Sequence, residues 1–370
     1  FKLIRVFSPK LSAMDKLKVF KTLVKNDISG TSPPIKEFED ELSKSFDRRF
    51  SIAVSNGSSA LDLALQSLDL KEGDEVIVPS FTIISCLSAI IRAGAVPIFC
   101  DVDKTSWNMT LDLTKQKVTK KTKAVLMVHL YGLVGEAKEI EDYCLKKNII
   151  LIEDSAEAHG QIIDGKKCGS FGKISTFSFY ANKHITTGEG GAVLTNDEII
   201  YKKIKQMANL DFNDKRFQHS NLFWNYRLSG IQASLGLSQI NSLNKTIIKK
   251  INQGKKYNEF FKNSEQFQIP PFEINGVVNH YWVYGILLNK DGIRDSVMKD
   301  LYENGIETRP FFWPLHLQDA LPSKYRLSNN SLKTSEHLGA NGFYIPIGQH
   351  INTRKQKFIS QKIIEVVNKY

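Results

Sequence analysis

The feature that most constrains the fold is a repeated alternation of short β-branched runs and amphipathic segments between residues 50 and 154. Runs with the length and composition of strands occupy residues 50–54, 75–78, 95–101, 124–130 and 149–154. Helical patterns lie between them, at residues 60–68, 84–93 and 135–147. This alternation favours right-handed crossovers and a mostly parallel sheet covered on both faces. In such a sheet, ligands bind beyond the carboxyl ends of the strands.

The last third of the chain has a different pattern. A long lysine-rich helix is predicted over residues 237–262, a strand over 281–288 and a helix over 294–304. A length of 370 residues is more than one average domain needs. We therefore predict an α/β chain with a large domain over residues 1–245 and a smaller α+β domain over residues 246–370.

The strongest candidate for a catalytic segment is STFSFYANKHITTGEGGAVLT, residues 175–195. Lys183 follows an aromatic, β-branched run and precedes a glycine-rich turn and a second strand. A lysine held rigidly there would be partly desolvated, which lowers its pKa and makes the amine nucleophilic. A hairpin with a solvated lysine fits the same pattern equally well.

Two further segments lie where strands meet helices. Asn56-Gly57-Ser58-Ser59 follows a strand and opens a helix, so its backbone amides could bind an anion, although Ser58 would also serve as an ordinary helix cap. Glu153-Asp154 ends the strand IILIED, at the edge where ligands are expected. A solvated strand end is the alternative there.

Taken together, these segments resemble the sugar-nucleotide aminotransferases of pyridoxal-phosphate (PLP) fold type I, the DegT/StrS family. The resemblance covers nearly the whole chain, with the matching pieces in order: SNGSSALDLAL, GDEVIVPSFT, VHLYG, ILIEDSAEAHG, TFSFYANKHITTGEGG, WNYRLSGIQASLGLSQI and GIETRPFFWPLH. Three segments, EDSAEA, NKHITTGEGG and ETRPFFWPLH, look most similar to members that aminate C4 of GDP-4-keto-6-deoxymannose.

The resemblance implies roles for individual residues. Lys183 would hold the PLP cofactor and later move a proton between substrate and cofactor. Asp154 would pair with the ring nitrogen, which keeps that nitrogen protonated. Around the ring, Glu157 would lie near the hydroxyl and Ala156 against the face. The cofactor phosphate would be held by Gly57, Ser58 and Ser178 and, from the neighbouring subunit of a homodimer with shared active sites, by Asn225. The candidates for binding substrate are Arg227, His219, Arg309 and His316.

The reaction that the resemblance implies is a transamination. Glutamate would give up its amino group and leave as 2-oxoglutarate, and a nucleotide-linked 4-keto-6-deoxy sugar would receive the amine. A keto-sugar 3-dehydratase on the same fold is one alternative, although a histidine replaces the lysine in such an enzyme, whereas this chain has Lys183 and places His184 after it. A non-catalytic regulator that binds PLP is the other alternative.

Composition limits the kinds of binding partner and the cellular compartment that we expect. Lys and Arg number 50 against 39 Asp and Glu, a formal net charge of +11, which favours anionic partners such as phosphorylated small molecules. No zinc motif or basic–aromatic interleaving is found, so no nucleic acid and no metal are expected. Four scattered cysteines and the absence of long apolar runs predict a reduced, cytoplasmic protein without membrane attachment. His129 is interpreted as a hydrogen-bonded strand histidine.

Overall fold

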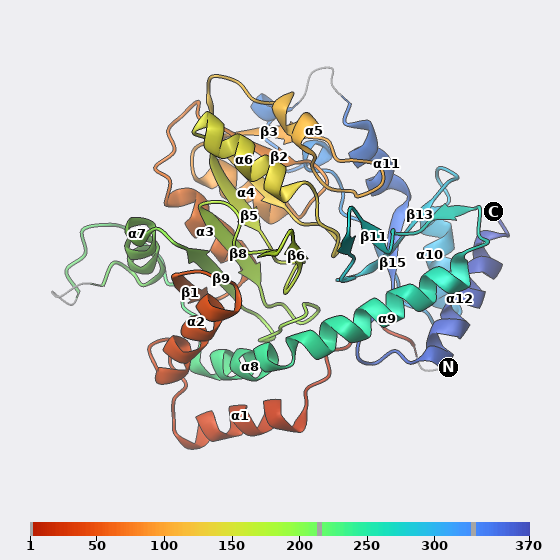
Figure 1. Cartoon of the computed structure of the whole chain (residues 1–370), viewed down its shortest axis with the longest axis horizontal. Coiled ribbons are helices and arrows are strands. Elements are labelled where there is room, and N and C mark those ends of the chain that lie inside the picture. Colours follow the sequence, from red (N-terminus) through yellow and green to blue (C-terminus); the bar gives the residue numbers. More distant parts are fainter. Residues whose placement is uncertain (1–2, 213–216, 327–330) are drawn as a thin grey trace.

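A seven-stranded sheet forms the centre of the computed structural model, which describes residues 3–212, 217–326 and 331–370 (Figure 1). Across the sheet, the strands follow the order β1, β9, β8, β5, β4, β2, β3. Their bounds are β1 Phe50–Val54, β9 Gly191–Thr195, β8 Ile174–Ser178, β5 Ile150–Asp154, β4 Thr122–Val128, β2 Glu75–Pro79 and β3 Val96–Cys100.

Most neighbouring strands of this sheet run parallel, as the sequence predicts. β8, β5, β4, β2 and β3 pair in parallel along the sheet, whereas β9 lies antiparallel between β8 and β1. Parallel strands need crossover connections, and helices supply them. The carboxyl ends of β4, β5 and β8 therefore meet at one edge, with Val128 opposite Asp154 and Asp154 opposite Thr176.

Helices cover both faces of the sheet because successive strand side chains point to opposite sides. On one face, α3 (Gly57–Gln66), α4 (Ile84–Arg92) and α7 (Glu198–Ala208) share a core with Ile52 and Val54 of β1. On the other face, α2 (Pro33–Ser45) and α8 (Gly230–Asn241) pack with Ala53 of the same strand. The helix α6 (Ala137–Lys147) covers β4 and β5 on that second face, beside the short α5 (Leu111–Lys115).

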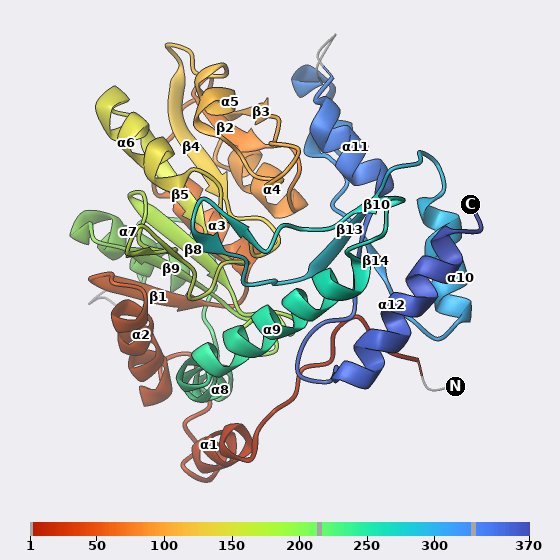
Figure 2. The same ribbon diagram turned by 45° about the vertical axis from the view of Figure 1, so that its right-hand side comes forward.

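A second, antiparallel sheet forms in the C-terminal third, in the order β10 (Phe267–Gln268), β13 (Tyr284–Leu288), β15 (Gly342–Ile345) and β14 (Arg309–Pro310). It shares a separate core with α9 (Leu243–Phe261), α10 (Arg294–Glu303) and α12 (Thr353–Val367). Figure 2 shows α9 running from beneath the large sheet to these C-terminal helices. The predicted domain boundary at residues 245/246 falls near the start of α9 and stays a prediction.

The remaining described elements lie outside these two sheets. They are α1 (Ala13–Val24), α11 (Lys333–Asn341), the 3₁₀ turns at Leu315–Leu317 and Ser323–Tyr325, and the two-stranded pairs β6 (Ile162–Ile163) with β7 (Lys166–Lys167) and β11 (Glu273–Ile274) with β12 (Val277–Val278). Within the described part of the chain, no helix combines the length and the apolar character needed to cross a bilayer.

The prediction of a single helix over residues 237–262 is wrong. The chain forms two helices that meet at Ser242, where φ is −100° and ψ is 0°. Asn241 donates a hydrogen bond from its side chain back to the carbonyl of Leu237, at 3.3 Å. Asparagine and serine compete for backbone hydrogen bonds in this way, which favours a helix end over a helix interior.

Candidate active site

A cavity of about 430 Å³ opens at the carboxyl ends of β4, β5 and β8. This volume lies within the range of small-molecule sites. Seven of the eight residues predicted to touch the cofactor line the cavity together: Gly57, Ser58, Asp154, Ala156, Glu157, Ser178 and Lys183. Gly57 and Lys183, which are 126 positions apart in the sequence, thus meet in one place, which the strand order makes possible.

The N-terminus of α3 forms one end of this cavity. Asn56 caps the helix, its side-chain oxygen accepting the backbone N–H of Ser59 at 2.8 Å. A Cβ on Gly57 would lie only 2.8 Å from the Cβ of Ser178, so glycine allows β8 and α3 to approach closely here. Free amides at a helix N-terminus attract anions. Ser58, whose hydroxyl lies 2.7 Å from that of Ser85, adds a polar side chain.

Asp154 lies deep in the cavity, with 3% of its surface exposed. Burial raises the pKa of this carboxyl, while the Ala156 backbone N–H at 3.1 Å and the charge of Lys183 act in the opposite direction. The thiol of Cys86 donates to its other oxygen across 3.8 Å. A carboxylate so poorly solvated gains most from a cationic partner placed in the cavity.

Lys183 and Glu157 form a buried ion pair inside the cavity. The Nζ of Lys183 lies 3.4 Å from Oε1 of Glu157, and the side chains are 9% and 7% exposed. The other Glu157 oxygen accepts the backbone N–H of Tyr131 at 2.9 Å. Burial lowers the pKa of Lys183 and raises the pKa of Glu157 to about 7, although each charge partly stabilises the other. The lysine is thus rigid and desolvated, as a nucleophilic amine requires.

Aromatic residues from distant parts of the chain complete the cavity, and the sequence interpretation missed their part in it. The Nζ of Lys183 lies 3.6 Å from the ring centroid of Trp282, a cation–π contact. Trp282 packs with the main core and not with the separate core of the C-terminal sheet. Phe312, Tyr344 and Tyr180 line the cavity as well. Their spacing in the sequence does not indicate that they lie around one cavity.

The other predicted site residues lie outside this cavity of their own chain. Asn225 is exposed, and its side-chain oxygen accepts the backbone N–H of Arg227 at 3.1 Å. The guanidinium of Arg227 donates to Asn209, and His219 is exposed with its ring 5.3 Å from that of Phe212. None of these placements tests a role in a neighbouring subunit.

Arg309 and His316 differ in their surroundings. Arg309 is exposed at the sheet edge and pairs with Glu307 at 2.7 Å. The ring of His316 is buried, with Nδ1 2.7 Å from the hydroxyl of Ser80 and Nε2 3.1 Å from a carboxylate oxygen of Glu336. Both ring nitrogens of His316 are therefore occupied by groups of its own chain, and its role toward substrate stays a prediction.

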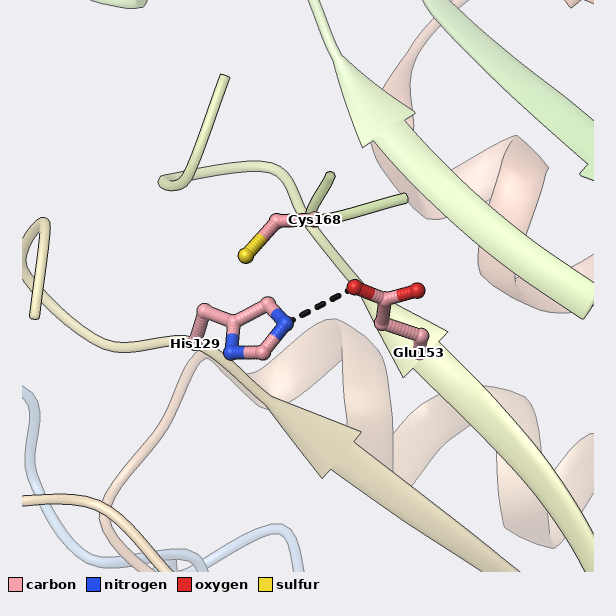
Figure 3. A group of neighbouring side chains, drawn as sticks. All are labelled: His129, Glu153 and Cys168. Carbon is pink, nitrogen blue, oxygen red and sulfur yellow. Dashed lines mark hydrogen bonds and ion pairs between the residues drawn. The ribbon is translucent and has the colours of Figure 1, made fainter. Parts of the chain in front are cut away.

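Glu153 and Asp154 point to opposite faces of β5, because they are consecutive in a strand. Glu153 accepts from the ring of His129 at 2.8 Å and from the Gly169 backbone N–H at 2.6 Å, next to Cys168 (Figure 3). All three side chains are buried. His129 is thus the hydrogen-bonded histidine that its strand position predicts, and this cluster joins β4 to β5 behind the cavity.

Comparison with known proteins bears directly on this arrangement. The sequence profile of the DegT/DnrJ/EryC1/StrS aminotransferase family matches residues 11–364. The chain belongs to this family. It is an aminotransferase with pyridoxal 5′-phosphate as its cofactor, and the fold is that of fold type I, as the sequence resemblance implies.

Relatives with assigned activities narrow the comparison further. The chain is 36% identical to the GDP-perosamine synthase of Escherichia coli O157:H7 over 365 residues, 98% of each protein. It is also 36% identical to the GDP-perosamine synthase of Vibrio cholerae over 320 residues, 85% of this chain and 86% of that one. The structure of Helicobacter pylori PseC, an aminotransferase involved in the biosynthesis of pseudoaminic acid, matches with a TM-score of 0.93 at 22% identity and full coverage of both chains.

The residues in the cavity fit the cofactor of the family. The helix N-terminus beside Gly57 provides amides for a phosphate, and a side chain at that position would fill the space. Asp154 supplies a buried carboxylate for a cationic ring nitrogen. Lys183 supplies the amine. The chain is therefore a sugar aminotransferase whose cavity has the donor and acceptor groups that PLP needs.

Proposed function

We propose that the chain transfers the amino group of glutamate to C4 of GDP-4-keto-6-deoxymannose and so produces GDP-perosamine, with 2-oxoglutarate as the second product. The observation that carries the proposal is the buried Lys183, which lies between Glu157 and the ring of Trp282 beside the carboxylate of Asp154. The 36% identity to two GDP-perosamine synthases supports this substrate.

The cofactor supplies an electron sink for the carbon that loses or gains a proton. Lys183 would hold the cofactor and then carry that proton, since its depressed pKa leaves a larger share of neutral amine to act as a base. Asp154 would hold a proton on the ring nitrogen, and Glu157 would lie at the ring hydroxyl. Gly57, Ser58 and Ser178 would bind the phosphate, and Ala156 would pack on the ring face.

The intact lysine favours amination over the 3-dehydratase alternative. The proton carrier that a transaminase requires is present and buried in the cavity. A regulator that only binds PLP would have no need of a base within reach of substrate. The transaminase is therefore the function that the geometry supports best.

To test this function, the purified holoenzyme is incubated with glutamate and GDP-4-keto-6-deoxymannose. The amounts of 2-oxoglutarate and of the amino sugar are then measured. Lys183→Ala should abolish both products while PLP still binds through its phosphate. Lys255→Ala, an exposed lysine of α9, is the matched control and should keep full activity. Borohydride reduction should fix the cofactor on Lys183. A label on another lysine, or an active Lys183→Ala variant, would contradict the assignment.

The substrate is tested separately. UDP-linked and dTDP-linked 4-keto-6-deoxy sugars replace the GDP-linked sugar in parallel reactions. The proposal expects the highest kcat/KM with the GDP-linked sugar. A preference for another base would mean that the chain uses the substrate of a different member of the family. The role proposed for Lys183 would not be affected. The amino donor is tested in the same way, with glutamine and alanine against glutamate.

The active enzyme is proposed to be a homodimer with shared active sites. One side of α1 exposes Met14, Leu17, Phe20 and Val24, although this helix already packs on α8 by its other side. Trp224 is 69% exposed next to Asn225. Apolar surface of this kind suits an interface, and a two-fold axis would give two equivalent sites. Asn225 would then reach the phosphate in the other subunit, and Arg227, His219, Arg309 and His316 would be tested as substrate contacts.

The proposed location is the cytoplasm. The four cysteines are free and buried, so none forms a disulfide within the described chain. Free thiols are typical of reducing compartments. Fractionation of the native host, with the chain detected by antibody, tests this proposal, and a periplasmic or membrane fraction would contradict it.

A further inference from the structure

A second cavity, of about 270 Å³, adjoins the one described above. Lys183 and Asn182 line both cavities. The remaining walls come from the N-terminal segment around Phe7–Asp15, the start of α9 and the loop at residues 347–350. None of the roles proposed above uses this second cavity.

The second cavity has an excess of lysines. Besides Lys183, it is lined by Lys10, Lys245, Lys249 and Lys250. Within the described residues, none of these four lysines forms an ion pair with a carboxylate. Among the described residues of the wall, the one carboxylate is that of Asp15, and one of its oxygens already accepts from the Ser12 backbone N–H and from the Gln239 side chain.

Three of these lysines form a path from solvent inward along α9. Lys245 is exposed, Lys249 is half-buried and Lys250 is buried, and the Nζ of Lys250 donates to the backbone carbonyl of Trp282 at 2.9 Å. Lys249 donates to the backbone carbonyl of Gln349 at 2.9 Å. Like charges four residues apart on a helix destabilise it. An anion bound in the cavity would compensate the like charges of Lys245 and Lys249.

The two histidines on the wall, His184 and His350, add no positive charge. Each uses its Nε2 on a backbone carbonyl, of His280 and Arg5 respectively. Burial lowers the pKa of both rings, which favours the neutral form. The positive charge of the wall therefore comes from the lysines, and a ligand that matches it must carry negative oxygens.

We propose that this second cavity binds a tetrahedral phosphate-type oxyanion, either free phosphate or the phosphate of a sugar phosphate. Such a ligand compensates the lysines, since its charged oxygens accept hydrogen bonds from their ammonium groups. Sulfate has the same shape and is expected to bind in the same way. The site does not depend on which sugar the enzyme aminates.

Anion binding there has a consequence for the neighbouring cavity. A negative charge beside Lys250 and Lys183 stabilises the protonated state of a nitrogen on either side chain. The pH midpoint of the visible absorbance of the bound cofactor should therefore rise when the anion binds. The other titratable groups of the cavity, Lys10, Asp15, Lys245, Lys249, His184 and His350, lie within the same wall and contribute to the same field.

The test uses the holoenzyme, so that the phosphate cradle of the first cavity is already filled. Inorganic phosphate, glucose 1-phosphate and sulfate are titrated by calorimetry at constant ionic strength. We expect saturable binding of both phosphate and sulfate, because both present charged oxygens to the lysines. Tighter binding of glucose 1-phosphate would identify a sugar phosphate as the source, and equal or weaker binding would identify free phosphate.

Lys249→Met and Lys245→Met should each weaken phosphate binding by about tenfold or more, since each removes a charge-assisted hydrogen bond. Lys255→Met, on the same helix but outside both cavities, should leave it unchanged. The upward movement of the absorbance midpoint with phosphate should disappear in Lys249→Met. Equal binding of phosphate in all variants, or no saturable binding, would overturn the proposal. Failure of the proposed transamination would leave these binding results unaffected.

Discussion

Replacement of Glu157 by glutamine tests how the cavity controls its lysine. The Glu157 Oε1 atom lies 3.4 Å from Lys183 Nζ, and the second carboxylate oxygen accepts from Tyr131. Glutamine has nearly the same shape, and its carbonyl oxygen can keep the bond to the Tyr131 N–H. The substitution thus removes the charge with little change in packing.

The magnitude follows from the distance between the two charged atoms. At 3.4 Å and an effective dielectric constant of about 20, two unit charges attract by about 5 kcal/mol, which sets a limit of roughly 3.6 pH units on the effect. The pKa of Glu157 is about 7, so the carboxyl is only partly ionised near neutrality and supplies less than this limit. We expect the pKa of Lys183 to fall further in the variant, because its ammonium form loses a partner.

The assay is the rate at which added PLP recombines with the cofactor-free chain, followed by absorbance between pH 5 and pH 10. The reaction needs the neutral amine of Lys183, so the rate rises through its pKa. The midpoint of this profile should move to lower pH in Glu157→Gln and stay near the wild-type value in Glu157→Asp. Glu189→Gln is the control, since Glu189 lines the same cavity without an ion pair to Lys183 among the described residues. A midpoint that is unchanged or higher in Glu157→Gln would refute the reasoning.

Three other predictions concern the cofactor, the interface and acid stability. Asp154→Asn should lower kcat by several orders of magnitude while the Kd for PLP changes far less, because the carboxylate supports the electron sink; near wild-type turnover would show another role. Mixing Lys183→Ala with Asn225→Ala subunits after mild dissociation should restore part of the wild-type activity, since one site per mixed dimer then has both residues, and exchange without recovery would exclude Asn225 from the neighbouring site. Burial lowers the pKa of His159 to about 3, well below the value of about 6.5 in an unfolded chain, so protonation favours unfolding as the pH falls below 6.5. His159→Gln should therefore lose about 2 kcal/mol less stability than wild type between pH 6.5 and pH 5 in urea titrations of the cofactor-free chain, and an acid dependence identical to that of wild type would contradict the buried neutral ring.

The sequence predicted the strands well where a short apolar run is bounded by turns. The runs at residues 50–54 and 149–154 correspond to β1 and β5 within one residue at each end. Their carboxyl ends position Gly57 and Asp154, so the order of strands determines much of the cavity. The junction at Ser242 was missed because a lysine-rich helical pattern continues across it, and only the local hydrogen bond from Asn241 reveals the break.

The aromatic wall of the cavity could not be predicted. Trp282 is a large apolar side chain in a strand-like run, and such a residue packs equally well in either of two cores. Its place over Lys183 depends on how the small sheet docks on the large one. The surroundings of His316 have the same origin, since Ser80 and Glu336 are 236 and 20 residues away from it in the sequence.

The opposite orientations of Glu153 and Asp154 separate two kinds of mutational sensitivity at adjacent positions. Changes at Glu153 should lower expression and melting temperature, because they leave His129 and the Gly169 amide without their shared acceptor. Changes at Asp154 should leave the folded yield largely intact and remove turnover. Deep mutational scanning that measures both protein abundance and growth would therefore separate the two positions. Substitutions of Glu153 should lower abundance, whereas substitutions of Asp154 should lower growth at normal abundance. The end of one strand thus contributes to folding through one residue and to catalysis through the next.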